Sequence, residues 1–175
     1  LLVLHADSRL HSNWPQRIRT TMASPTAAAA AFHFDLRING HHPLLRLLEG
    51  AVALRCRWFQ EPYGDQGLLI HRALYEQIGG FRPLPLMEDL DLVQRLKRIT
   101  QLRSLRQPIH TSALRWVRDG VLQRCWTNAR LRHRWRRGDR PEELVVAYEG
   151  PFSWRTKRRN GDPGAPDPIL DADKN

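Results

Sequence analysis

The sequence is poor in cysteine and has no long apolar run, and each absence excludes a class of protein. Two cysteines in 175 residues are too few for a disulfide framework or a cysteine-based metal knuckle, and they are typical of a reducing compartment. No stretch approaches about 18 consecutive apolar residues, so we expect no transmembrane helix. The opening residues lack the charged segment of a signal peptide. We therefore expect a cytoplasmic, globular protein.

Positive charge is in excess, and much of it lies near the C-terminal end. The chain has 28 Lys and Arg against 18 Asp and Glu, a net charge of +10. Residues 115–140 contain nine arginines, three tryptophans and only two acids. This mix suits a solvated helix face, or one bound peripherally at the anionic inner face of a membrane. A basic nucleic-acid-associated protein is the alternative function, but no nucleic-acid-binding motif accompanies the charge, so no nucleic-acid partner is expected.

Apolar periodicity predicts strands that alternate with helices, as in an α/β sandwich. Residues 1–7 (LLVLHAD) are typical of a buried parallel strand, and residues 32–38 (FHFDLRI) alternate as a half-buried strand does, with His33 on the outer face. LLI at residues 68–70 predicts another strand, and one or two short strands are expected within residues 102–113. Helices are predicted over residues 12–22, 43–59, 71–80, from 88 and from about 119 to 135.

One domain is expected over residues 1–150. Residues 151–175, first basic and then acidic, have too few apolar side chains to fold and are expected to be disordered. Because the opening strand is typical of the interior of a sheet, we expect earlier strands to precede Leu1, so that the domain is N-terminally truncated.

Polar side chains gather in three loops, at residues 5–9 (HADSR), 62–67 (PYGDQG) and 85–89 (PLMED). Ligands of open α/β sheets bind outside the carboxyl ends of the strands, and Asp7 is predicted to lie at such an end. One carboxylate with a nearby imidazole can hold a divalent ion that also takes phosphate oxygens from its ligand. These loops are therefore candidates for a binding site.

Three acids follow the third of these loops, in the sequence MEDLDL. Acids in the first turn of a helix are favoured by the helix dipole, at about 0.3–1 kcal/mol each, so Glu88, Asp89 and Asp91 could all be helix caps. The alternative is that one of them acts in catalysis. The helix that they begin is expected to bury one face, formed by Leu92, Val93, Leu96 and Ile99.

Three segments, taken in order, resemble family 2 glycosyltransferases. They are LHADSRL, GDQGLLIHRALYEQIGGFRPLPLMEDLDLVQRLKR and TSALRWVRDG, and the resemblance covers roughly residues 1–135. It is closest to the branch labelled radical-SAM/selenodomain-associated transferases. The resemblance implies a GT-A fold, a Rossmann-like mixed sheet flanked by helices. It also implies inverting transfer of a sugar from a nucleotide-sugar donor to an unknown acceptor, with most of the donor-binding part of the fold expected before Leu1.

The resemblance also assigns roles to residues. Asp7 matches the last acid of an Asp-x-Asp motif that holds Mg²⁺ or Mn²⁺ against the donor diphosphate, and His5 stands where the first acid usually lies. Glu88 and Asp89 match the family's Glu-Asp pair, whose Asp is the usual general base. A base must be ionised, and the N-terminal dipole favours that form. We therefore predict Asp89 as the base, with Glu88 either beside it in the catalytic site or serving only as a cap.

Two further groups are expected near the substrates. Arg115 and Trp116 resemble the end of a Gln-x-x-Arg-Trp motif, which predicts contact with the donor and the acceptor respectively, although Trp116 could equally lie in the core. Ser112 replaces the Gln of that motif, which argues against a processive polymer synthase. The acceptor pocket is expected to be lined by Gly64, Asp65 and Gln66, which could instead simply close a turn.

Overall fold

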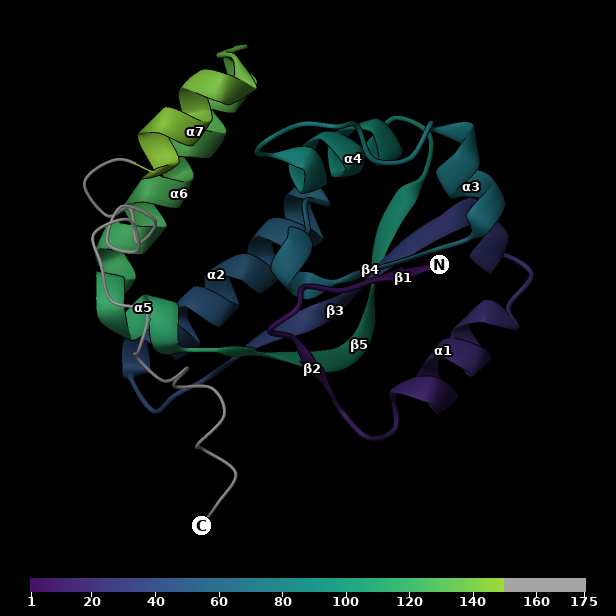
Figure 1. Cartoon of the computed structure of the whole chain (residues 1–175). Coiled ribbons are helices and arrows are strands. Elements are labelled where there is room, and N and C mark those ends of the chain that lie inside the picture. Colours follow the sequence, from purple (N-terminus) through teal and green to yellow (C-terminus); the bar gives the residue numbers. More distant parts are fainter. Residues whose placement is uncertain (150–175) are drawn as a thin grey trace, which may run out of the picture.

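The computed structural model describes residues 1–149, apart from the side chains of Arg115 and Glu149, and shows a curled, mixed sheet flanked by helices (Figure 1). The five strands are β1 (Leu2–Val3), β2 (Arg9–Leu10), β3 (Ala30–Asn39), β4 (Leu68–Ile70) and β5 (Gln101–Ser112). The α-helices are α1 (Trp14–Met22), α2 (Pro43–Phe59), α3 (Arg72–Gln77), α4 (Glu88–Lys97), α5 (Leu114–Asp119), α6 (Val121–Arg136) and α7 (Pro141–Glu149). Short 3-10 turns, η1 (Ala27–Ala29) and η2 (Gly64–Gln66), precede β3 and β4.

The sheet has the strand order β1-β4-β3-β5-β2. Only β3 and β5 pair in parallel, and the other three pairings are antiparallel. The register of β3 with β5 shifts between His33 and Asp35, where β5 carries extra residues. Pro108 follows this irregularity, as expected for a residue that cannot donate to a strand ladder. The α/β class is thus confirmed, and β5 is one long strand rather than two short ones.

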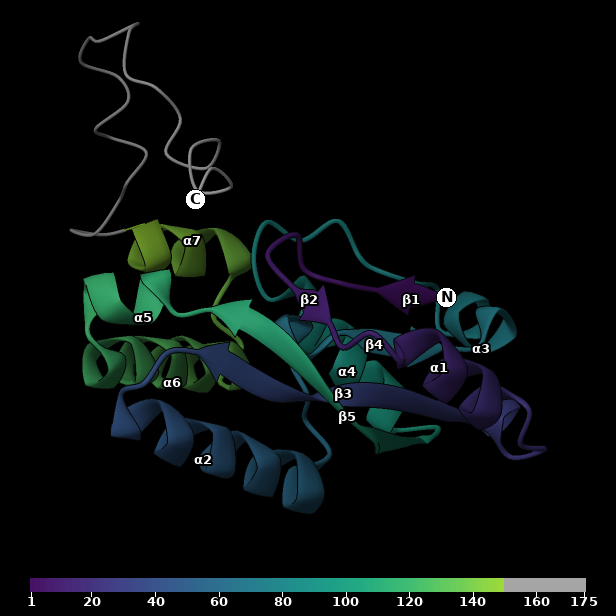
Figure 2. The same ribbon diagram turned by 90° about the horizontal axis from the view of Figure 1, so that it is seen from below.

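The core is built on both faces of the two central strands. Phe32 and Leu105 pack with the inner side of α1, whereas Ala31 and Leu102 pack with α3 and α4. Farther along β3, Ile38 and its neighbours pack against α2. Figure 2 shows these helices distributed around the sheet. Over residues 30–34 both faces of β3 are covered, so its side chains there are buried on both sides.

His33 was predicted on an exposed face of its strand, and this is wrong. His33 is only 3% exposed, and its Nδ1 lies 3.0 Å from the carbonyl oxygen of Phe34. The amide of Gln66 lies above it, with Nε2 at 3.4 Å from the same ring nitrogen. Burial lowers the pKa of His33, because the charged imidazolium loses its hydration. The alternating pattern identified the strand but not the loop that covers its second face.

The opening segment also differs from its prediction. Strand β1 pairs antiparallel with β4, Leu2 lying opposite Leu69, at the edge of the sheet and only partly buried. It ends at Val3, so Asp7 lies in the following loop and not at the carboxyl end of a parallel strand. Strands β1 and β2 occupy opposite edges of the sheet, and residues 4–8 run between them (Figure 1).

The helices follow the sequence closely in the middle of the chain. Helix α2 begins at Pro43 and ends at Phe59, as predicted, and the side chain of His42 caps its first turn. Helix α4 begins at Glu88 as predicted, but it ends at Lys97, so Ile99 lies beyond it and is 51% exposed. Helix α7 was not predicted. No described helix has both the length and the apolar character needed to cross a membrane. The predicted disorder of residues 151–175 falls outside the described residues.

Candidate active site

Side chains from the three polar loops meet beside Gly64. The backbone N–H of Gly64 donates to Oδ2 of Asp89 at 2.7 Å. A Cβ atom placed on Gly64 would lie 3.1 Å from Oδ2 of Asp89 and 3.1 Å from Cδ2 of His5. The missing side chain of Gly64 is therefore what allows His5, from the β1–β2 loop, and Asp89, from α4, to approach the same point.

The Asp89 carboxylate is held by backbone groups. Its Oδ1 accepts from the N–H of Leu90 at 2.7 Å, and its Oδ2 accepts from Gly64. Met87, directly before this turn of helix, has a left-handed backbone with φ of 65°. For a residue other than glycine, this left-handed conformation costs about 1–3 kcal/mol. The carboxylate is thus fixed in place, and each oxygen keeps a lone pair for a further hydrogen bond.

A second carboxyl group, that of Asp65, lies close to the first. Burial raises the pKa of Asp65; the positive charge of Arg55 opposes this, and the negative charge of Asp89 adds to the rise. The residue as a whole is partly exposed, but its Oδ1 atom is buried. The site therefore combines an Asp89 side chain held by N–H donors with an Asp65 carboxyl group whose pKa is raised, and perturbed pKa values are common in active sites.

Three buried polar atoms in these loops have no hydrogen-bond partner in the described part of the chain. They are Oγ of Ser8, the hydroxyl of Tyr63 and Oδ1 of Asp65. A buried polar atom without a partner costs about 1–3 kcal/mol, so folded proteins leave few of them. Such atoms are typical of sites that bind a ligand or ordered water.

Asp7 and His5 lie side by side in the β1–β2 loop. Nδ1 of His5 is 3.7 Å from Oδ1 of Asp7, and the side chains are 50% and 35% exposed respectively. Within residues 1–149 no three His, Cys, Asp or Glu side chains gather as a ready-made metal site. This pair offers one oxygen and one nitrogen ligand, which fits a cation that takes its remaining ligands from a diphosphate and water.

Gln66 is buried beneath its loop. It is 1% exposed; its Oε1 accepts from Nη2 of Arg55 at 3.0 Å, and its Nε2 donates to the carbonyl oxygen of Phe34 at 3.2 Å. Its side chain fastens the loop to α2 and β3, so the alternative of a turn-closing residue describes it better than acceptor binding does.

Trp116 is also a packing residue in this structure. It is partly buried against the cluster that contains Ile38, Leu45 and Val52. The guanidinium carbon of Arg124 lies 5.7 Å from the centre of its indole ring. Arg115 lies in the same helix, but its side chain is outside the described part of the chain.

Asp91 has a different role from the cap suggested by its position. It is 7% exposed, and its oxygens pair with Arg95 at 2.7 Å and with Arg82 at 3.3 Å. Arg95 also donates to the carbonyl oxygens of Ile78 and Gly80. The carboxylate therefore ties α4 to the glycine turn after α3. Glu88, by contrast, is partly exposed and lies in the first turn as predicted.

The structure adds three residues that the sequence did not indicate. The ring of Tyr63 has the guanidinium carbon of Arg55 at 3.7 Å and that of Arg132 at 5.1 Å from its centre. Burial lowers the pKa of Arg132 and raises that of Tyr63. These contacts fix the loop beside Gly64 to α2 and α6. No local pattern could have revealed them, because Arg132 is far from the other two in the chain and Arg55 and Tyr63 belong to different elements.

Comparison with protein-family models, with curated proteins and with solved structures found no match for this chain.

Proposed function

We propose that this protein is an inverting, metal-assisted glycosyltransferase of the GT-A type, which transfers a sugar from a nucleotide-diphospho-sugar to a hydroxyl acceptor. The observation that supports this most strongly is the meeting of His5, Gly64 and Asp89, from three separate loops, around a fixed carboxylate. The motifs that resemble family 2 glycosyltransferases contain these same residues. The unpartnered buried atoms nearby are a second, independent reason to expect a ligand there.

The reaction needs a base on one side of the anomeric carbon. In this proposal Asp89 accepts the proton of the acceptor hydroxyl, and the acceptor oxygen forms a bond to the anomeric carbon. The bond from that carbon to the diphosphate oxygen breaks in the same displacement, and the nucleoside diphosphate leaves. Attack from the face opposite the leaving group inverts the configuration of the carbon.

The leaving diphosphate needs positive charge on the other side. Asp7 and His5 are the residues that would hold Mg²⁺ or Mn²⁺, which would neutralise the charge that develops on the diphosphate. A single carboxylate binds a divalent cation weakly, because it provides less negative charge than a two-acid site. Most of the cation's affinity is therefore expected to come from the nucleotide.

Replacing Asp7 by Ala should abolish metal-dependent binding of a nucleoside diphosphate. In calorimetric titrations with Mn²⁺ present, the unaltered chain should bind UDP or GDP more tightly than without the metal. Asp7→Ala should lose that difference, whereas Glu142→Ala, which removes an exposed acid from α7, should keep it. If Asp7→Ala bound the metal–nucleotide pair as well as the unaltered chain does, Asp7 would not be a metal ligand.

The activity itself can be tested without knowing the acceptor. Water can replace the acceptor slowly in such enzymes, so release of nucleoside diphosphate from a panel of UDP-, GDP- and dTDP-sugars should be measurable when Mn²⁺ is present. The full chain should release diphosphate from at least one donor, and chelation of the metal should stop the release. Absence of release from every donor, with and without candidate acceptors such as simple sugars and polyprenyl phosphates, would contradict the proposed function.

A position at an anionic membrane surface is supported by a separate observation. Helices α5 and α6 expose large apolar side chains: Leu114, Val117, Leu122 and Trp126 are between 60% and 78% exposed. Arginines surround them, and the guanidinium carbon of Arg130 lies 5.5 Å from the ring centre of Trp126. Exposed apolar groups among cations are typical of helices that lie in the headgroup region of anionic lipid.

Vesicle binding should therefore depend on Trp126. We expect the chain to sediment with vesicles that contain phosphatidylglycerol, less so as salt is raised, and not with vesicles of phosphatidylcholine alone. Trp126→Ala should weaken this binding several-fold. Trp58→Ala is the matched control, since Trp58 is 69% exposed but lies on α2 rather than on α5 or α6. An equal loss of vesicle binding in both variants, or equal binding to neutral vesicles, would contradict the proposed position at an anionic membrane surface.

A further inference from the structure

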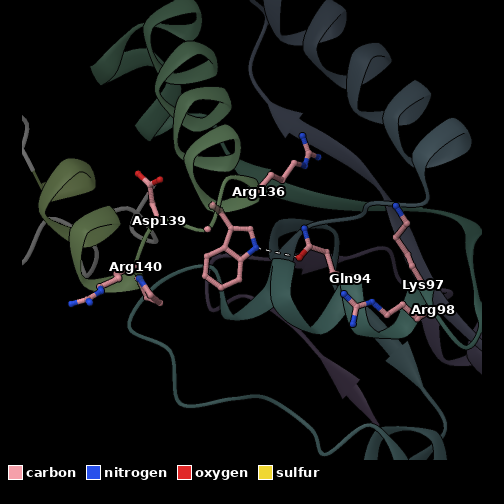
Figure 3. Close-up of a pocket in the computed structure, with 9 residues that line it drawn as sticks. Gln94, Lys97, Arg98, Arg136, Asp139 and Arg140 are labelled. Carbon is pink, nitrogen blue, oxygen red and sulfur yellow. Dashed lines mark hydrogen bonds between the residues drawn. The ribbon is translucent and has the colours of Figure 1, made fainter.

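A concave site lies at the far end of α4, away from Asp89. A pocket of about 780 Å³ opens between the last turn of α4 and the connection from α6 to α7 (Figure 3). It is lined by Gln94, Lys97, Arg98, Trp135, Arg136, Gly138, Asp139, Arg140 and Pro141. Its volume lies within the range of about 300–1,000 Å³ that is usual for small-molecule sites. None of the residues that the proposed reaction uses lines it.

The lining of this pocket is strongly basic. Four of its side chains are cationic, those of Lys97, Arg98, Arg136 and Arg140, and only Asp139 is acidic. Asp139 is itself paired, because its Oδ2 accepts from Nε of Arg134 at 2.6 Å. It therefore adds almost no free negative charge to the pocket.

Two of the four cations share one buried acid. Glu61, 8% exposed, accepts from Nζ of Lys97 at 3.0 Å and from Nη2 of Arg136 at 2.5 Å. Arg98 and Arg140 are exposed and have no acidic partner among the side chains that the structure describes. Lys97 and Arg98 lie at the C-terminal end of α4, whose dipole favours cations but does not cancel their charge. The pocket thus keeps a net positive charge, with two cations held in position and two free to move.

The remaining wall is aromatic. The indole Nε1 of Trp135 donates to Oε1 of Gln94 at 3.2 Å, which joins α6 to α4 across the pocket. In Figure 3 Lys97 and Arg98 lie on the same helix as Gln94, Arg136 lies on the other side of the hydrogen bond, and the charged end of Arg140 points away from these side chains. A bound ligand would therefore meet a flat apolar surface and several guanidinium groups.

We propose that this pocket binds a phosphate-bearing anion, as a monoester or diester of phosphate or as a diphosphate. Guanidinium groups donate paired N–H bonds that match phosphate oxygens. The three arginines and the lysine of the pocket carry more positive charge than the single carboxylate of Glu61 neutralises. The site is independent of the proposed transfer reaction. Its lining residues Gln94, Lys97 and Arg98 lie about 8 to 14 Å from Asp89 along the chain direction of α4, at 1.5 Å per residue. The phosphate can belong to a soluble ester or to a lipid headgroup, which share this chemistry.

Calorimetric titration of the full chain with inorganic pyrophosphate tests the proposal, at constant ionic strength set with chloride. Binding should occur, and Arg98→Gln and Arg140→Gln should each weaken it by about tenfold, the size of one lost hydrogen bond between charged groups. Both side chains are exposed, so the variants should melt as the unaltered chain does. Arg19→Gln is the matched control, because it removes the same charge from an exposed site on α1.

Pyrophosphate also distinguishes the two sources of phosphate. If it releases the chain from phosphatidylglycerol vesicles, and Arg98→Gln weakens vesicle binding, the ligand is a lipid headgroup. If pyrophosphate binds but leaves vesicle binding unchanged, the ligand is a soluble phosphate compound. Absence of pyrophosphate binding would overturn the proposal, and so would equal weakening by Arg19→Gln, which would mean that only net charge matters.

Discussion

Asp89→Asn should reduce sugar transfer by about 10²–10⁴-fold while the protein stays folded. The substitution keeps the size of the side chain, and the amide oxygen can still accept one of the two backbone N–H bonds from Gly64 and Leu90. It removes the charge and the proton acceptor. The measurement is the initial rate of nucleoside diphosphate release from the best donor, alongside a thermal melt.

Glu88→Gln is the control for this prediction. Glu88 lies in the same first turn of α4 and is partly exposed, so its neutralisation removes an equal charge from the same helix end. We expect a much smaller loss of rate, well below the effect at Asp89. Equal losses of rate in both variants would mean that Glu88 and Asp89 only stabilise the helix. A loss of rate in Asp89→Asn that is explained by a lower melting temperature would mean the same.

Asp91→Ala should be the most destabilising change in the acidic cluster. Removing one partner of a buried ion pair costs about 3–5 kcal/mol, because the other charge stays buried without compensation. Arg95, with its side chain 13% exposed, would keep its bonds to two carbonyl oxygens but lose its carboxylate. At about 2–4 °C per kcal/mol for a chain of this size, the melting temperature should fall by roughly 10 °C.

Glu76→Ala provides the comparison for that measurement. Its pair with Arg72 has the same i, i+4 relation as the pair of Asp91 with Arg95, but both side chains are more than half exposed. Exposed pairs contribute about 0–1 kcal/mol, so this variant should melt within a few degrees of the unaltered chain. A similar small shift for Asp91→Ala would show that its ion pairs do not hold α4 in place.

The local elements could be predicted because their signals are local. Pro43 at the start of α2 and the glycines after α3 mark helix ends by backbone chemistry that needs no distant partner. The buried strand LLI was equally recognisable by its apolar run. The direction of β1 could not be predicted in this way, because pairing with β4 depends on residues far along the chain.

The candidate site could likewise be predicted only in part. The loops that hold His5, Gly64 and Asp89 were identified from their polar residues, and the structure brings those three residues together. The structural roles of Gln66 and Asp91 could not be predicted from the sequence, because the residue type alone does not show whether its amide or carboxylate is buried. Their partners, Arg55 and Arg95, become visible only once the helices are packed.

The loop that carries His5 and Asp7 joins strands on opposite edges of the sheet, and this has a consequence for the order of folding. Leu2 pairs with Leu69, and Leu10 pairs with Ile109, so both ends of the loop are fixed by contacts of large sequence separation. Each edge strand has only two residues, whereas β3 pairs with β5 along most of its length, so the edge contacts return less stabilisation for their loop-closure entropy and tend to form late. We infer that β3, β4 and β5 assemble first. His5 then reaches Gly64 only when the two edge strands have docked, so amide protons of residues 2–10 should exchange with solvent through partial opening that leaves the central strands intact.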